Sequence, residues 1–330
     1  RTKSRGLGDV YKRQVYFRET DYGEFNVANY LTNSNGFGAQ FGYPTSDITR
    51  LGFNVTYDKT DIDVGTLPAL EIYDFVSAEG NIFETLSVQF SWQRVTLNRG
   101  LFPTAGSSTV ISLSTTVPGS DLSYYRSSIR QRYYRPLSSN FVFGFSGELG
   151  YLDAYGETEE TPFFQNFYAG GPRSLRGFES NTLGPRSTDA PCYEFNYEEK
   201  TCPNLIDTDG DGELDSPYIN PYANSTSRYR DRPIGGNIKV EGSMQLIFKL
   251  PFIEDQRSLR SAFFFDFGNV FSDNCKDYQI NCYKPALEDL RYSYGVGVTW
   301  ITGFGPLSLA ISKPTTVSYT HLTLPTRSTV

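Results

Sequence analysis

Hydrophobic and polar residues alternate with a period of two along several segments of the chain. The stretch LSVQFSWQ (86–93) alternates large apolar residues with serine and glutamine, and RYSYGVGVTW (291–300) alternates tyrosine, valine and tryptophan with polar or small residues. In SAFFFDFGNVF (261–271), Phe264 and Asp266 fall on the face opposite the neighbouring phenylalanines. Successive side chains of a β-strand point to opposite faces. These segments therefore predict strands with one apolar face and one polar or small face.

The pattern predicts about eleven strands, joined by tight turns and by long connections. The turns PTSDIT, RPLSSN and TGFG contain the residues that tight turns prefer, whereas the connections 59–82, 153–236 and 272–290 are long. The predicted strands are 15–25, 36–43, 50–58, 83–96, 108–117, 124–135, 141–152, 237–250, 261–271, 291–301 and 306–313.

The composition of the two strand faces distinguishes a soluble β-sandwich from a transmembrane β-barrel. A soluble β-sandwich is one reading, with the apolar faces turned inward to a core. However, the polar faces are rich in glycine, serine, glutamine and arginine, and the apolar faces end in aromatic residues. A lipid-facing band with a polar lumen explains both faces, so we predict an all-β protein, an antiparallel transmembrane β-barrel with short periplasmic turns and long outer loops. Bacterial single-chain barrels have an even number of strands, so the odd count predicts an incomplete barrel.

Composition narrows the classes of function. The 330 residues carry a formal net charge of −7, which argues against nucleic acid as the main partner. No apolar run approaches the length of a transmembrane helix. The only histidine is His321, in a tail that we expect to be foreign, so Ser-His-Asp and Cys-His catalysis and the commonest zinc sites lose a required member. We therefore predict that the protein is not an enzyme.

Both ends of the chain read as foreign sequence. DVYKRQ (9–14) can be encoded by codons whose reverse complement, read in another frame, encodes VSYTH, and VSYTH stands at 317–321. An inverted copy at both ends resembles a sequencing adapter translated with the gene. We expect residues 1–14 and 317–330 to be non-native, and residues 15–316 to form the partial barrel, with one long outer loop at 153–236.

Four cysteines form two local pairs in turn-rich stretches, Cys192 with Cys202 and Cys275 with Cys282. An even number of cysteines in loops is typical of disulfides made in an oxidising compartment, and the short spacings favour the local pairing. A metal site is the alternative, although the chain has no Cys-x-x-Cys motif.

An acidic stretch, DTDGDGELD (207–215), begins like a calcium-binding loop, with alternate oxygen ligands and a glycine for a sharp turn. Tyr218 stands where an EF-hand has its bidentate glutamate. Asp215, at the ninth position, would instead close a shorter loop of the kind seen in extracellular calcium repeats. Calcium is the one candidate cofactor, and a solvated acidic loop is the alternative. The candidate ligands are Asp207, Asp209, Asp211 and Asp215.

Three arginines, Arg126, Arg130 and Arg132, share one face of a predicted strand. Arginine facing lipid is costly, so this should be the lumen face. These side chains either steer a substrate or pair with inner carboxylates such as Glu148, and we expect pairing.

The most distinctive stretch is FYAGGPRSLRGFESNTLGPR (167–186). A phosphate-binding loop would need a following helix or a Gly-Lys-Ser/Thr sequence, and neither is present. On a barrel, this stretch resembles the sixth outer loop of the BamA family, which carries a Val/Leu-Arg-Gly-Phe/Tyr element. Further segments of that family are resembled, in the same order, by GGN (235–237), FFFDFGNVF (263–271) and SYGVGVTWITGFGPLSLAISKP (293–314). The element is matched here by Leu175, Arg176, Gly177 and Phe178.

The resemblance spans about residues 15–314 and implies a sixteen-stranded barrel, preceded by POTRA domains and integral to the outer membrane of Gram-negative bacteria. It implies that the loop folds back into the lumen, where Arg176 contacts Asp266 on the inner wall. The family has a second acidic partner where this chain has Gln245, which could still accept a hydrogen bond from Arg176. A Cys192–Cys202 disulfide would match a disulfide in the family's loop.

The resemblance also implies a function. The family folds and inserts other barrels without nucleotide or covalent chemistry, through a separable seam whose free strand edge receives substrate strands. Its partners are unfolded outer-membrane proteins, assembly-machine lipoproteins that dock on the POTRA domains, and membrane lipid and lipopolysaccharide. By alignment, this chain runs from the fifth to the fifteenth strand and lacks both seam strands. The alternatives are a two-partner secretion or translocation-assembly transporter of the same superfamily, and a passive porin.

Overall fold

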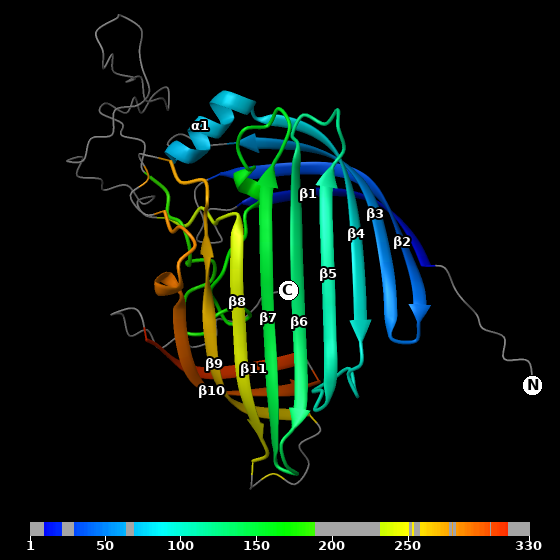
Figure 1. The fold of residues 1–330 in the computed structure, drawn as a ribbon, viewed down its shortest axis with the longest axis vertical. Coiled ribbons are helices and arrows are strands. Elements are labelled where there is room, and N and C mark those ends of the chain that lie inside the picture. The colour runs from blue at the N-terminus through cyan, green and yellow to red at the C-terminus, as the bar shows by residue number, and fades with distance from the viewer. Residues whose placement is uncertain are drawn as a thin grey trace, which may run out of the picture.

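The computed structural model describes residues 10–21, 30–63, 69–188, 232–250, 253, 258–276, 279, 282–303 and 305–315. Within these ranges, eleven strands form one antiparallel sheet, in which sequential strands pair in order from β1 to β11 (Figure 1). The strands are β1 (Val10–Asp21), β2 (Leu31–Ser46), β3 (Thr49–Asp63), β4 (Ile82–Val95), β5 (Gly106–Thr116), β6 (Tyr124–Pro136), β7 (Phe141–Ala154), β8 (Ile238–Phe248), β9 (Leu259–Phe271), β10 (Arg291–Thr302) and β11 (Gly305–Pro314). The helices are α1 (Leu70–Glu79), η2 (Phe163–Gln165) and η3 (Leu287–Asp289).

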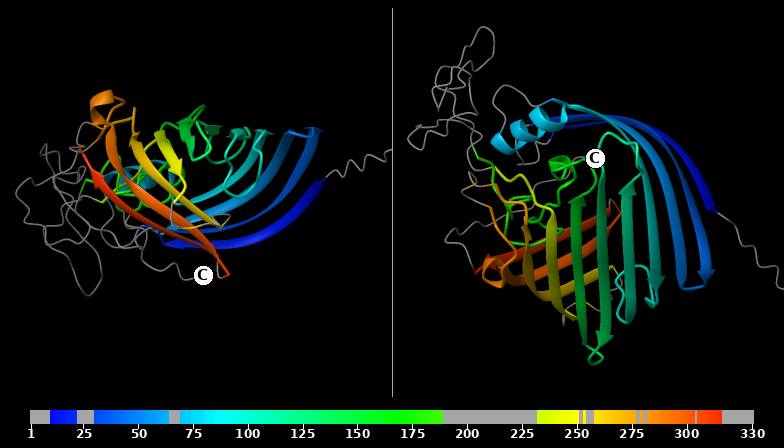
Figure 2. Two further views of the ribbon diagram at one scale, coloured as in Figure 1. Left: turned by 90° about the horizontal axis from the view of Figure 1, so that it is seen from below. Right: turned by 45° about the horizontal axis from the view of Figure 1, so that its top comes forward.

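The sheet is strongly curved, as expected for the wall of a barrel (Figure 2). β1 and β11 are the two ends of the strand order. The connection from β2 to β3 is a tight turn at one end of the sheet, whereas the long connection that contains α1 lies at the other end (Figure 1). The predicted all-β antiparallel barrel and its alternation of short and long connections are therefore confirmed.

The two faces of the sheet differ as the sequence pattern predicts. In β9, Phe263 and Phe265 are exposed, whereas Phe264 and Asp266 are buried on the opposite face. The same exposed apolar face continues around the sheet, because strands paired without crossovers keep one parity on one face. Its members include Phe17, Phe37, Phe53, Phe90, Leu113, Ile129, Leu149, Leu246, Trp300 and Leu309.

No helix of the described segments is both long enough and apolar enough to cross a membrane.

Several strands are longer than predicted. β2 and β3 pair from Leu31 with Asp63 to Ser46 with Thr49, whereas the prediction ended the second of these strands at residue 58. The sequence after that point, KTDID (59–63), is polar and hides the alternation, but backbone pairing does not require apolar side chains. The first strand begins at Val10, inside the stretch expected to be foreign. Strand pairing does not show where those residues come from, so their origin stays a prediction.

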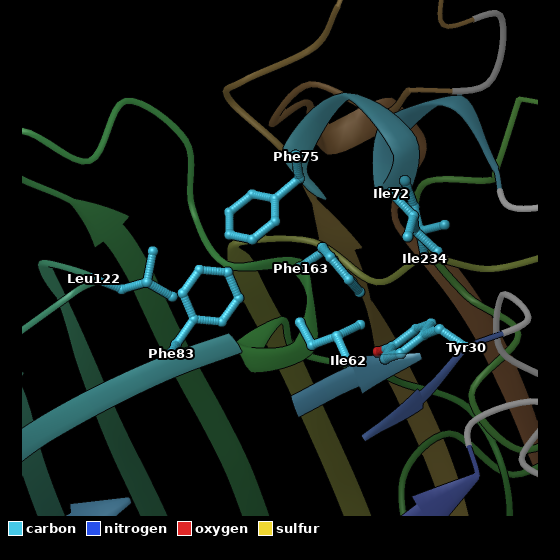
Figure 3. Close-up of a cluster of buried hydrophobic side chains, with 8 residues drawn as sticks. All are labelled: Tyr30, Ile62, Ile72, Phe75, Phe83, Leu122, Phe163 and Ile234. Atoms are coloured by element: carbon cyan, nitrogen blue, oxygen red, sulfur yellow. The ribbon is translucent and has the colours of Figure 1, made fainter. Parts of the chain in front are cut away.

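Helix α1 departs from the prediction, which makes the whole connection 59–82 a loop. Its Ile72, Phe75 and Val76 recur at the spacing that places apolar side chains on one helix face. In Figure 3, Ile72 and Phe75 point from α1 toward Phe163 and the rest of a buried cluster. The ring centroids of Phe75 and Phe163 are 5.3 Å apart in an edge-to-face arrangement, which aromatic rings prefer. The complete cluster is Tyr30, Ile62, Ile72, Phe75, Phe83, Leu122, Phe163 and Ile234.

Candidate functional site

The connection between β7 and β8 returns to the inner face of the sheet. Phe167 bridges Gly236, and Ala169 bridges Leu183, so the segment forms an ordered turn on the wall. Leu175 lies at the centre of this turn and is fully buried. It belongs to a second apolar cluster with Leu152, Phe167, Ala169, Leu183 and Val270, against which Phe178 packs. Residues 170–178 are called the loop turn below.

Arg176, in the loop turn, forms a bidentate ion pair with Asp266 of β9. Its Nε donates to Oδ2 at 2.7 Å and its Nη2 donates to Oδ1 at 2.7 Å. The backbone N–H of Arg176 also donates to Oδ2, at 3.1 Å. The side chain of Asp266 is 0% exposed and that of Arg176 is 19% exposed, so water screens the pair little. Charge-assisted bidentate pairs of this kind are strong and directional. The structure thus brings together the two residues that the resemblance paired.

On the adjacent strand β8, Arg176 reaches Ser243 and not Gln245. Its Nη2 donates to Oγ of Ser243 at 2.9 Å, while Nε2 of Gln245 donates to the same oxygen at 3.4 Å. The strand register explains the difference. Ser243 lies directly opposite Asp266, whereas Gln245 lies opposite Phe264. Gln245 is therefore one hydrogen bond removed from the guanidinium.

Register brings two further residues to Arg176 that the sequence did not suggest. Ser293 of β10 also lies directly opposite Asp266, and its hydroxyl donates to the backbone oxygen of Arg176. The guanidinium carbon lies 3.4 Å from the centroid of the Phe264 ring, within the range of a cation–π contact. Ser243, Asp266 and Ser293 form one row across three strands, and every member of the row binds Arg176.

Gly177 allows the loop turn to approach the wall this closely. Its φ of 94° lies in the left-handed region, which side chains disfavour. A Cβ at this position would lie 3.1 Å from Oγ of Ser312 and 3.5 Å from Cβ of Ser293. A larger residue would therefore strain the backbone and push the turn away from β10 and β11.

The arginines of β6 that were predicted to face the lumen lie on the inner face of the sheet. Arg130 pairs with Glu148 of β7, with 2.9 Å between Nε and Oε1, so the expected pairing with an inner carboxylate is confirmed for this arginine. The guanidinium carbon of Arg126 lies 4.2 Å from the centroid of the Phe167 ring, so this arginine contacts the loop itself.

The cysteines and the acidic stretch are only partly within the described residues. Cys275 and Cys282 form the predicted local disulfide, with 5.8 Å between their Cα atoms. Cys192, Cys202 and the stretch 207–215 lie outside the described ranges, so the loop disulfide and calcium binding stay predictions. Calorimetric titration of a peptide of the acidic loop with calcium would test the latter.

Glu71 of α1 ties the helix to the end of the loop. Its two carboxylate oxygens accept the backbone N–H of Thr188 at 3.0 and 3.1 Å, and Oε1 also accepts Nε2 of Gln279 at 3.1 Å. Burial raises the pKa of Glu71, although its hydrogen bonds oppose that shift. One carboxylate therefore links three separate connections at the end of the sheet where α1 lies.

An antiparallel sheet with an exposed apolar outer face, and with its own loop docked on a polar inner face, defines an integral outer-membrane β-barrel protein. The family follows from comparison with known sequences. The Omp85 superfamily domain matches residues 5–320, so the chain belongs to the Omp85 superfamily.

Individual relatives agree with this family. The outer membrane protein assembly factor BamA of Neisseria meningitidis is 28% identical over 313 residues, which are 88% of this chain and 35% of the relative. The mouse sorting and assembly machinery component 50 homolog is 21% identical over 281 residues, 84% of this chain and 50% of the relative. The chain thus spans at most half the length of these two relatives.

A solved structure supports the same barrel. The crystal structure of BamA from Haemophilus ducreyi lacking POTRA domains 1–3 superimposes with a TM-score of 0.73 at 25% identity, over 93% of this chain and 56% of that one. The resemblance to the BamA barrel, predicted from the loop motif and the strand order, is confirmed.

Proposed function

We propose that this barrel belongs to a protein that folds and inserts other β-barrels into the outer membrane, without covalent chemistry and without nucleotide. The observation that carries the proposal is the buried Arg176–Asp266 pair, which fastens a long outer loop onto the inner wall. The names of the BamA relatives support it, because one of them is an assembly factor for outer-membrane proteins.

The docked loop fits an assembly role better than passive transport. A porin needs an open lumen, whereas here a loop lies on the inner wall and is held by charge. Breaking one partner of a buried ion pair costs about 3–5 kcal/mol. Because Arg176 binds residues of β8, β9 and β10 together, it stiffens this part of the wall. A stiff wall allows strands elsewhere in the barrel to separate and offer an edge to a substrate strand.

The proposed partners follow from this role. The substrates are unfolded outer-membrane proteins, whose strands would add to a free strand edge through backbone hydrogen bonds. Membrane lipid and lipopolysaccharide surround the exposed apolar face. Assembly-machine lipoproteins would dock on POTRA domains, as the family resemblance implies. Nucleic acid has no part in the proposal.

The experiment places the full-length protein in proteoliposomes and follows the folding of an added substrate barrel by its heat-modifiable migration on gels. We expect the wild-type protein to accelerate folding, and Arg176→Ala or Asp266→Ala to slow it. A planar-bilayer recording of the same preparation distinguishes the alternatives. Steady conductance without accelerated folding would indicate a porin. Passage of an extended passenger without folding of barrels would indicate a secretion transporter.

A further inference from the structure

A second group of charged side chains holds the loop turn, on the strand next to Asp266. Oγ of Ser174 donates to Oε2 of Glu241 on β8 at 2.7 Å. The same hydroxyl oxygen accepts the backbone N–H of Gly170 at 3.0 Å, so Ser174 closes the turn that leads into Arg176. The turn is thus bound to the wall both at Ser174 and at Arg176.

Glu241 occupies an unfavourable place for a carboxylate. It lies directly opposite Glu148 in the pairing of β7 with β8. Side chains directly opposite one another have Cβ atoms about 4.5–5.5 Å apart, and like charges there are destabilising. The two side chains are only 17% and 16% exposed, so water does little to screen the repulsion.

Lys239 neutralises this facing pair. It lies two residues before Glu241 on the same strand face, and its Nζ is 3.0 Å from Oε2 of Glu241 and 3.2 Å from Oε2 of Glu148. The side chain is 12% exposed, so its charge acts at short range in a poorly hydrated site. Arg130 supplies a second positive charge to Glu148 from β6. Two positive and two negative charges therefore balance across β6, β7 and β8.

We propose that Glu241 and Lys239 are positioning residues that form a second anchor for the loop turn. Glu241 binds Ser174 directly. Lys239 acts through Glu241, because without its charge the two facing carboxylates would repel and Glu241 would leave Ser174. The second anchor fixes the turn one residue before Leu175 enters its apolar cluster, and thereby fixes where Arg176 meets Asp266. Its importance for assembly rests on the proposed function, but its existence does not.

The test is hydrogen exchange of the loop turn, measured by mass spectrometry on the full-length protein in lipid nanodiscs. Lys239→Gln should accelerate exchange of the amides of Gly170, Gly171 and Ser174 by about tenfold, the effect of losing a hydrogen bond to a charged group. The double variant Lys239→Gln/Glu148→Gln removes the facing charge as well. It should restore exchange to near the wild-type rate, which a general loss of stability would not allow.

Two further variants complete the design. Lys59→Gln is the matched control, because Lys59 pairs with Glu84 on an exposed part of the same barrel, at 3.0 Å. It should leave exchange of the loop turn unchanged. Ser174→Ala alters no charge and tests the same contact if Lys239→Gln fails to fold, with the same acceleration expected.

Wild-type exchange in Lys239→Gln, or no recovery in the double variant, would overturn the second anchor. If Lys239→Gln does not fold, wild-type exchange in Ser174→Ala overturns it instead. Failure of the wild-type protein to accelerate folding of substrates would overturn the proposed function and leave these exchange results standing.

Discussion

Replacing Asp266 with asparagine keeps the size of the side chain and removes its charge. In the wild-type protein this carboxylate accepts two bonds from the guanidinium of Arg176 and one from its backbone N–H. Asparagine offers one acceptor oxygen, and its amide group would face a donor of the guanidinium. Arg176 would keep Ser243 and the ring of Phe264, but neither carries a negative charge.

The expected magnitude follows from burial. Removing one partner of a buried ion pair costs about 3–5 kcal/mol. Asp266 is fully buried, whereas Arg176 keeps 19% of its surface and can regain some hydration when it loses its partner. We therefore expect the lower end of the range, about 3 kcal/mol, which corresponds to a rise of about 100-fold in the equilibrium constant for opening of the loop turn.

Hydrogen exchange reports this opening at amides that do not contact Asp266. The N–H of Gly171 donates to the backbone oxygen of Leu175 at 3.1 Å, and the N–H of Ser174 donates to that of Gly171 at 3.1 Å. Both amides should exchange about 100-fold faster in Asp266→Asn. The control is Arg173→Ala, an exposed arginine of the same turn, which should change exchange by less than about threefold. Equal exchange in the two variants would refute the reasoning.

Three further predictions concern the end of the sheet where α1 lies. Because the pKa of Glu71 is raised above 4.5, docking of α1 should be most stable below pH 4.5 and should weaken as the pH rises through the raised pKa. Hydrogen exchange of the α1 amides measures this, and the same pH dependence in the wild-type protein and in Glu71→Gln would contradict it. Phe75→Ala should cost about 3–5 kcal/mol of local stability, measured by exchange of α1 against the exposed control Tyr73→Ala, and equal effects would argue against the buried cluster. Reduction of Cys275–Cys282, seven residues apart, should cost about 2–3 kcal/mol, and unchanged thermal unfolding would refute it.

The strands and their faces could be predicted because alternation is a local property. Two neighbouring residues, Phe264 and Phe265, already show by parity which side chain faces the loop and which faces lipid. The contact between Arg176 and Asp266 is implied by the resemblance of the loop motif to the family, and the parity of Asp266 agrees with it.

Other contacts depended on register and on the return path of the loop, which alternation does not determine. Ser243 and Gln245 share one parity, so only the pairing of β8 with β9 decides that Ser243 lies opposite Asp266. Lys239 and Glu241 have the same parity as Ser243, and that signal could have assigned them to the inner wall. The contact of Glu241 with Ser174 could not have been predicted from parity, because the return path of the loop decides which loop residue meets which wall residue.

The decisive comparison is the folding rate of a substrate barrel in proteoliposomes that contain the wild-type protein, Arg176→Ala, Asp266→Ala or the double variant. If the two side chains act as one anchor that the assembly reaction requires, each single variant should be slow, and the double variant should be no slower than the slower single variant. A wild-type rate in either single variant, or effects that multiply in the double variant, would contradict a shared role in assembly.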